Sequence, residues 1–187
     1  MNMVKNFSAI ICEGSAEQAI IEILLEKECL IIEIDDYLIN KGPIRTRSAK
    51  NFCDTYMGKN YASKIDLFRI IDSRNEKFNF GSKKYKKIFE EKINIVNVIT
   101  PPEIELLIIV NENKYIDFDK SKCNKPSDYC QQVLKMKDVK SFDFVKNYFS
   151  NENDLINAIK KVHKMKKTVI PPNFRTLYDL LKPTLKK

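Results

Sequence analysis

The sequence predicts an α/β fold, with a mostly parallel sheet flanked by helices and followed by a C-terminal helical extension. Short β-branched or apolar runs alternate with helix-like segments from residue 7 to about residue 112, the pattern of a doubly wound parallel sheet. Beyond residue 125 the signals are helical. The composition, 43% hydrophobic and 31% charged over 187 residues, suits one core of ordinary size. We therefore expect an α/β domain over residues 1–124, with residues 125–187 packed on it as a basic helical extension.

The first half of the predicted sheet lies before residue 57. Residues 7–12 (FSAIIC) predict a short buried strand, and residues 15–28 place apolar side chains at helical spacing. The β-branched residues 30–34 predict a second strand. A Gly–Pro pair at 42–43 then breaks the chain, and Ser48 can cap a helix that runs to about residue 56.

The second half of the sheet is expected over residues 65–99. Residues 65–71 (IDLFRII) predict the third strand and residues 93–99 the fourth, with an amphipathic helix over residues 82–92 between them. Two prolines at 101–102 stand where prolines open helices, and residues 103–110 continue as a largely buried helix. The extension should add helices over residues 127–136, 142–149, 154–166 and 173–181.

The net charge of +8 is concentrated in the extension. Residues 1–136 carry 21 Lys/Arg against 20 Asp/Glu, whereas residues 137–187 carry 12 against 5. A basic C-terminal quarter on a nearly neutral body is typical of a protein that binds a polyanion such as nucleic acid. A solvated lysine face is the alternative, and charge alone does not exclude it. The residues expected to contact phosphates are Arg45, Arg47, Lys120, Lys122, Lys125, Lys160, Lys161 and Lys164.

Acidic residues follow three of the predicted strands. Glu13 comes directly after the first strand, Asp72 directly after the third, and Glu105 shortly after the fourth. Because ligands of parallel sheets gather beyond the carboxyl ends of the strands, these carboxylates are candidates for a common pocket. Glu17 lies one helical turn beyond Glu13 and can face the same pocket. The alternative for this pair is that both residues only stabilise the N-terminus of a helix through its dipole.

Three short motifs resemble those of Toprim domains, in particular the OLD-type and RloB-like nuclease branch. The strand that ends at Glu13 and enters a helix with Glu17 resembles the family's opening E-G-x-x-E motif. Residues 72–74 (DSR) resemble the D-x-D motif, with Arg in place of the second acid. Residues 102–109 (PEIELLII) are similar to the P-x-F-E-L-W-L-L segment of RloB-like proteins and align Glu105 with the family's Glu.

The resemblance implies a metal-dependent nuclease that cleaves phosphodiester bonds in DNA or RNA. It implies catalysis by Glu13, Glu17, Asp72 and Glu105, of which Glu13, Asp72 and Glu105 would bind Mg²⁺ or Mn²⁺. Glu105 would replace the missing second acid, and Arg74, which stands at the position of that acid, would hold the phosphate. The family also implies a role in phage defence and a partner protein such as an ATPase subunit.

Two alternatives to the nuclease stay open. One is a Toprim-like nucleic-acid-binding protein that has lost the second acid and with it cleavage; the other is a non-enzymatic interaction or regulatory subunit. Unpaired carboxylates at close range repel, so the cluster should come with a metal ion or with a nearby Arg or Lys. We also expect Glu13 to face solvent, in which case Glu13→Ala would keep the fold.

Two classes of protein are disfavoured by the sequence. Five scattered cysteines without CxxC spacing predict free thiols in a reducing cytoplasm rather than disulfides or a structural zinc site. The longest apolar stretches are too short to span a bilayer, so we expect no membrane segment.

Overall fold

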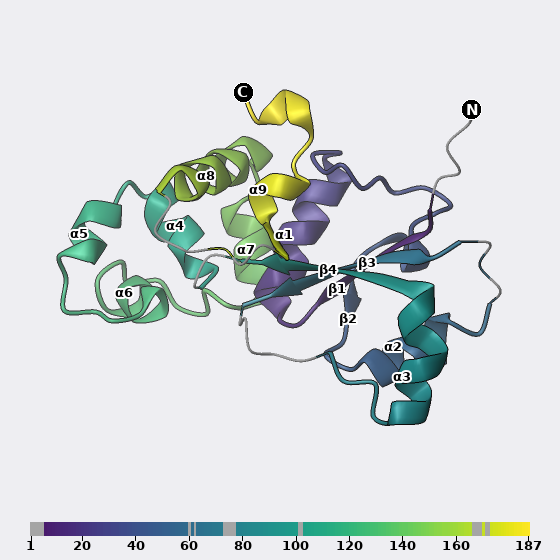
Figure 1. Ribbon diagram of the computed structural model, residues 1–187. Helices are drawn as coiled ribbons and strands as arrows, with labels where there is room; N and C mark the ends of the chain where they lie inside the picture. Colours follow the sequence, from purple (N-terminus) through teal and green to yellow (C-terminus); the bar gives the residue numbers. More distant parts are fainter. Residues whose placement is uncertain are drawn as a thin grey trace.

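The protein has an α/β fold built on a parallel sheet, as the sequence predicts (Figure 1). The computed structural model describes residues 6–59, 61, 63–72, 78–100, 103–165, 170 and 173–187. All strand pairs of the five-stranded sheet are parallel, in the order β2-β1-β3-β4-β5. The strands are β1 (Ser8–Cys12), β2 (Ile44–Arg45), β3 (Ile65–Ile71), β4 (Ile93–Ile99) and β5 (Phe174–Thr176).

The register of the strands assigns alternate residues to two separate cores. Ile65 of β3 lies opposite Ile93 of β4, and Ala9 of β1 lies opposite Leu67, so residues of the same parity share a face. The face of Ala9, Ile65, Leu67 and Ile93 packs into the smaller core, whereas Ile10, Cys12, Ile70 and Val98 pack into the larger one. The same alternation places the polar side chains of Arg69 and Asn97 on one face.

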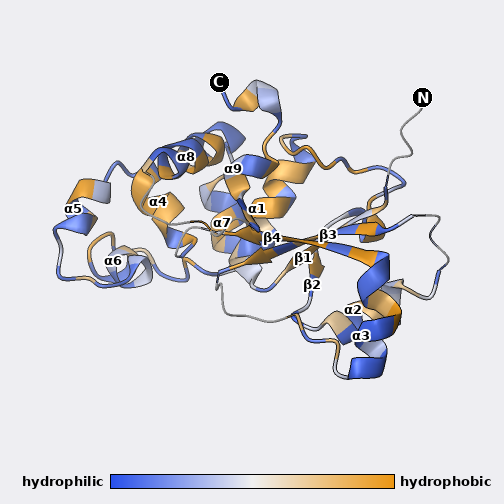
Figure 2. Cartoon of the chain, in the orientation of Figure 1, coloured by the Kyte–Doolittle hydropathy of each residue, from blue (hydrophilic) through white to orange (hydrophobic). Residues whose placement is uncertain are grey.

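The larger core lies between the sheet and the helices above it in Figure 1. In α1 the spacing of Ala16, Ala19, Ile20, Ile23 and Leu24 turns one apolar face toward the sheet. Hydrophobic colour accordingly gathers in the strands, α1 and α4 in Figure 2. The helices of this side are α1 (Ser15–Glu26), α4 (Glu105–Asn111), α5 (Tyr115–Asp119), α6 (Pro126–Gln132), α7 (Phe142–Tyr148), α8 (Glu152–Met165) and α9 (Leu177–Leu180).

The smaller core lies on the opposite face, where α2 (Ala49–Tyr56) and α3 (Lys83–Phe89) appear below the sheet in Figure 1. Ser48 caps α2 as expected, because its side chain accepts a hydrogen bond from the Asn51 backbone amide. Phe52 fills this core with only 1% of its surface exposed. Short 3₁₀ turns complete the chain at Ile39–Lys41, Glu90–Lys92 and Pro183–Leu185.

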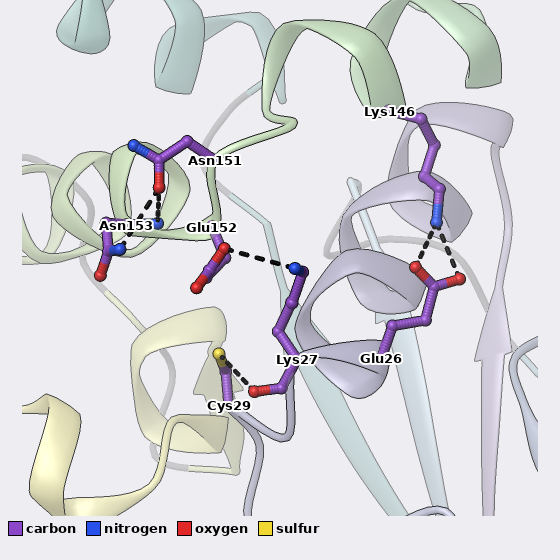
Figure 3. Close-up of polar contacts among 7 residues, drawn as sticks. All are labelled: Glu26, Lys27, Cys29, Lys146, Asn151, Glu152 and Asn153. Atoms are coloured by element: carbon purple, nitrogen blue, oxygen red, sulfur yellow. Dashed lines mark hydrogen bonds and ion pairs between the residues drawn. The ribbon is translucent and has the colours of Figure 1, made fainter.

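Ion pairs join the end of α1 to the C-terminal helices (Figure 3). Lys146 Nζ on α7 lies 2.9 and 2.7 Å from the two carboxylate oxygens of Glu26, and Lys27 Nζ lies 3.8 Å from a carboxylate oxygen of Glu152 on α8. Near the start of α8, the Asn151 side-chain oxygen accepts two hydrogen bonds from Asn153. Exposed pairs of this kind stabilise little on their own, so the apolar contacts beneath them hold the helices to the sheet.

One predicted strand assignment is wrong. Residues 30–34 are not the second strand: Leu30 makes only an isolated antiparallel bridge to Leu181, and Ile31 and Ile34 are half exposed. The second strand is Ile44–Arg45, just after the Gly–Pro break. The β-branched run is therefore not a strand, whereas a two-residue segment is, because pairing with a neighbouring strand decides strand formation more than local preference does.

The expected extension is not wholly helical. Within the predicted helix over residues 173–181, Phe174–Thr176 form β5, which pairs with the edge of β4, and only Leu177–Leu180 are helical. The extension thus supplies a strand of the sheet. The helix predicted over residues 127–136 is shorter than expected: α6 ends at Gln132 and begins at Pro126, whose missing N–H suits a first helical turn.

Other predictions are confirmed. β3 and β4 have the predicted bounds, and α7 and α8 lie within two residues of theirs. The cysteines are free, and four of the five are buried. Among the helices that the structure describes, none is long and apolar enough to cross a membrane.

Candidate functional site

A pocket of about 170 Å³ lies at the carboxyl edge of the sheet. The chain adds β2 on one side of β1 and then β3 on the other, so the strand order reverses between β1 and β3. Parallel sheets bind ligands at such a switch point. The pocket opens there, between the ends of β1 and β3 and the start of α4. Its lining includes the residues Glu13, Gly14, Glu17, Arg47, Asp72, Glu103, Glu105 and Lys140.

Glu13 is held by an ion pair inside the sheet layer. Arg69 Nη2 donates to Glu13 Oε1 at 2.7 Å, and Arg69 Nη1 donates to Asn97 Oδ1 at 3.2 Å. The side chains of Arg69 and Glu13 are 3% and 4% exposed. The contact follows from parity, since Arg69 and Asn97 share the face of Leu67 and Glu13 continues the odd series of β1.

The burial of Glu13 corrects the expectation that it faces solvent. Arg69 cannot lose its proton, so removing Glu13 would leave a buried guanidinium without its counter-charge. Glu13→Ala is therefore expected to destabilise the fold rather than to leave it intact.

Gly14 allows Glu17 to fold back over the turn between β1 and α1. A Cβ placed on Gly14 would lie 2.2 Å from Glu17 Oε2, too close for any side chain in the present arrangement. The contact involves the flexible end of the Glu17 side chain, so a larger residue at position 14 would require Glu17 to turn away, while the backbone there, with φ −119° and ψ 169°, suits any residue.

Glu17 has a raised proton affinity. Burial raises the pKa of Glu17, and the negative charges of Asp72 and Glu105 raise it further, while a hydrogen bond from its own backbone amide and the charge of Lys140 act in the opposite direction. Asp72 itself is exposed at the end of β3. Carboxylates from three separate segments therefore act on one another across this pocket.

The α4 side of the pocket is neutralised by a different cation. Glu105 is 1% exposed, and Lys140 Nζ lies 3.2 Å from its Oε1, while the Lys140 side chain is 64% exposed. Burial raises the pKa of Glu105, a shift that its own backbone amide and Lys140 oppose. The neighbouring Glu103 accepts a hydrogen bond from the Ser127 backbone amide at the start of α6.

The residues expected to contact phosphates do not form one surface with the pocket. Arg47 lines the pocket and is exposed; Arg45, Lys120, Lys122 and Lys125 are also exposed but are not part of its lining. Lys160, Lys161 and Lys164 line a separate hollow with Asn111 and Asn113, beyond the opposite end of α4. Arg74 lies outside the described residues.

The pocket has donor atoms for a metal ion but no complete set of protein ligands among the described residues. Within the described part of the chain, no three His, Cys, Asp or Glu side chains are grouped to enclose a metal ion. The lining nevertheless includes five carboxylates, whose oxygens Mg²⁺ and Mn²⁺ prefer. Mg²⁺ is commonly held by one or two carboxylates together with water and substrate phosphates. The carboxylates could therefore bind a cation whose coordination is completed by water and by the substrate. They do not form a closed protein cage.

Sequence reasoning missed Arg69, Asn97 and Lys140. A signal for the first two was present: a charged residue within the apolar strand IDLFRII, and an Asn four residues into INIVNVI, need buried polar partners. Lys140 gave no such signal, because it is one of many lysines in a basic segment.

Comparison with known proteins adds no relative: no family model, no curated protein and no solved structure matches the chain. Fold and pocket together define the class, an α/β protein with a carboxylate-lined pocket at the switch point of a parallel sheet.

Proposed function

We propose that the pocket binds Mg²⁺ or Mn²⁺ and cleaves phosphodiester bonds in nucleic acid. The proposal rests on one observation: Glu13 and Glu17, Asp72, and Glu105 come from three distant segments and line a single pocket at the switch point of the sheet. The raised pKa of Glu17 supports it: burial is the main cause, but the negative charges of Asp72 and Glu105 add to the shift, and a bound cation would relieve their repulsion. The likeness of three motifs to Toprim nucleases is consistent with it.

The roles of the side chains follow from their exposure and partners. Asp72 is exposed at the end of β3, and its negative charge raises the pKa of Glu17 across the pocket. These two carboxylates would therefore hold the cation. When bound, the cation would polarise the scissile phosphate and favour ionisation of an attacking water. The oxygen of the Glu17 carboxylate that does not bind the cation would accept a proton from that water. Arg47 and Lys140 line the same pocket and would hold phosphate oxygens.

The test uses the purified full chain with labelled single- and double-stranded DNA and RNA. We expect cleavage with Mn²⁺ and none with EDTA, and a loss of about 100-fold or more in Asp72→Asn. Mn²⁺ at about 100 times its Kd should stabilise the wild type by about 2.7 kcal/mol, a midpoint increase of roughly 5–10 °C.

The matched control is Glu91→Gln, a substitution at an exposed carboxylate outside the lining of the pocket. It should cleave and respond to Mn²⁺ like the wild type. A wild-type protein that neither cleaves nor gains stability with Mn²⁺ would refute the proposal.

A non-catalytic nucleic-acid-binding protein is the second candidate. It is favoured by the ion pairs of Glu13 with Arg69 and of Glu105 with Lys140, which already neutralise two of the carboxylates. Salt-sensitive binding that does not depend on Mn²⁺, without cleavage, would identify this function.

A further inference from the structure

A second hollow, of about 810 Å³, lies on the face of the sheet that carries the smaller core. Its lining combines three kinds of side chain. Phe78, Phe80 and Phe174 are aromatic, Lys83 and Lys86 come from α3, and Arg69 and Asn97 come from the strands. We call this hollow the aromatic groove.

Arg69 is fixed in the lining of this groove by its contacts. Its Nη2 and Nη1 bind Glu13 and Asn97, and its guanidinium lies 4.8 Å from the ring centre of Phe78. Among the described residues its Nε is buried and has no hydrogen-bond partner. Because this atom is buried, the groups of the groove that a ligand can reach are the partly exposed rings of Phe78 and Phe174 and the exposed lysines of α3.

The charge of the groove selects an anionic ligand. Lys83 and Lys86 are exposed, and the one acidic residue of the lining within the described part of the chain is Glu90, whose Oε1 lies 3.4 Å from Lys86 Nζ. A nucleotide has both features that this groove suits: a planar base that can stack on a phenylalanine ring, and a negatively charged phosphate beside it. Bases are free to stack in this way only where the nucleic acid is unpaired.

We propose that the aromatic groove binds unpaired nucleotides of a single-stranded nucleic acid. Their bases stack on the partly exposed rings of Phe78 and Phe174, and Lys83 and Lys86 hold the phosphates. Arg69 connects the groove to the acidic pocket, because its partner Glu13 lines that pocket. The inference rests on the proposed function to the extent that nucleic acid is the substrate; it adds that the strand is unpaired beside the scissile bond.

The charge part of the test uses two matched pairs of lysines on α3. Binding of a fluorescent oligothymidylate of about 12 nucleotides is measured by anisotropy in EDTA, where no cleavage occurs. The variant Lys83→Gln/Lys86→Gln should bind about tenfold more weakly than the wild type. Lys84→Gln/Lys87→Gln removes the same charge from the same exposed helix outside the groove, and should lose less than about threefold. Equal losses in the two variants would overturn the inference.

The stacking part of the test compares the oligothymidylate with an abasic strand of the same length. The wild type should prefer the strand with bases by about tenfold, and Phe78→Ala should abolish this preference while binding the abasic strand unchanged. Equal wild-type affinity for the two strands, or tighter binding of a duplex, would overturn the inference.

Asp72→Asn separates this inference from the proposed function. The variant should bind oligothymidylate like the wild type, because Asp72 does not line the groove. Groove-dependent binding without cleavage in Mn²⁺ would refute the nuclease alone, whereas cleavage with equal losses in the lysine pairs would refute the groove alone.

Discussion

The two sides of the acidic pocket neutralise a buried glutamate in opposite ways. On the strand side, Glu13 pairs with Arg69, and both side chains are almost fully buried. On the α4 side, Glu105 is just as buried, but its partner Lys140 keeps 64% of its side chain in solvent. Glu13 is therefore tied to the stability of the sheet, whereas Glu105 is held by a cation that water can readily hydrate.

The largest expected effect comes from removing the strand-side carboxylate. Glu13→Leu leaves the Arg69 guanidinium buried, with Asn97 as its remaining side-chain acceptor among the described residues, and arginine cannot neutralise itself by losing a proton. Breaking a buried pair in this way costs about 3–5 kcal/mol. Urea unfolding followed by circular dichroism measures the loss.

A double variant sharpens this test. Glu13→Leu/Arg69→Met replaces both charges with apolar side chains, and such replacement of a buried pair is often neutral. It should therefore recover most of the stability lost in Glu13→Leu. A double variant no more stable than Glu13→Leu would show that packing, rather than the uncompensated charge, causes the loss.

The length of each strand and its place in the sheet explain which strands could be predicted from the sequence. The strands β3 and β4 were predictable because their apolar runs of seven residues form central strands whose partners lie on both sides. β2 and β5 were not, since two or three residues at an edge have too little pattern to stand out and depend on the register of the neighbouring strand.

The acidic residues of the pocket were predictable from the rule that parallel strands end at one edge of the sheet. Their cations were harder to find. Arg69 could have been paired with Glu13 only once the order β1-β3 and the register were known, because the two residues are 56 positions apart in the chain. Lys140 reaches Glu105 from the segment before α7, an approach that depends on how the C-terminal helices pack.

A smaller effect, of opposite sign, is expected at Glu17. Its folded-state pKa is raised, chiefly by burial, so the folded protein retains a proton that the unfolded chain has already lost. Stability should therefore fall as pH rises from about 4.3, the ordinary value for Glu, through the raised folded-state pKa. Glu17→Gln cannot ionise, so its stability should depend less on pH and exceed that of the wild type by about 1 kcal/mol at neutral pH.

Thermal unfolding measured from pH 4 to pH 8 checks this prediction. The two proteins should converge at the acidic end, where Glu17 is protonated in both states of the wild type. Parallel curves over the whole range would contradict the raised pKa. Glu105, whose pKa is also raised by burial, remains in the variant and should leave it some pH dependence.

The smallest effect is expected on the α4 side. Glu105→Leu makes the same exchange as Glu13→Leu at an equally buried position, but here the abandoned cation is Lys140, which can turn to water at little cost. The variant loses the hydrogen bond between the Glu105 carboxylate and its own backbone amide, and it gains from burying an apolar side chain. We expect the free energy of unfolding to stay within about 1 kcal/mol of the wild type, as for partly exposed ion pairs. Mn²⁺ titration of this stable variant then isolates the role of Glu105. If Glu105 replaces the missing second acid, Mn²⁺ affinity falls while the fold is unchanged; if Glu17 and Asp72 hold the cation, Mn²⁺ affinity is retained.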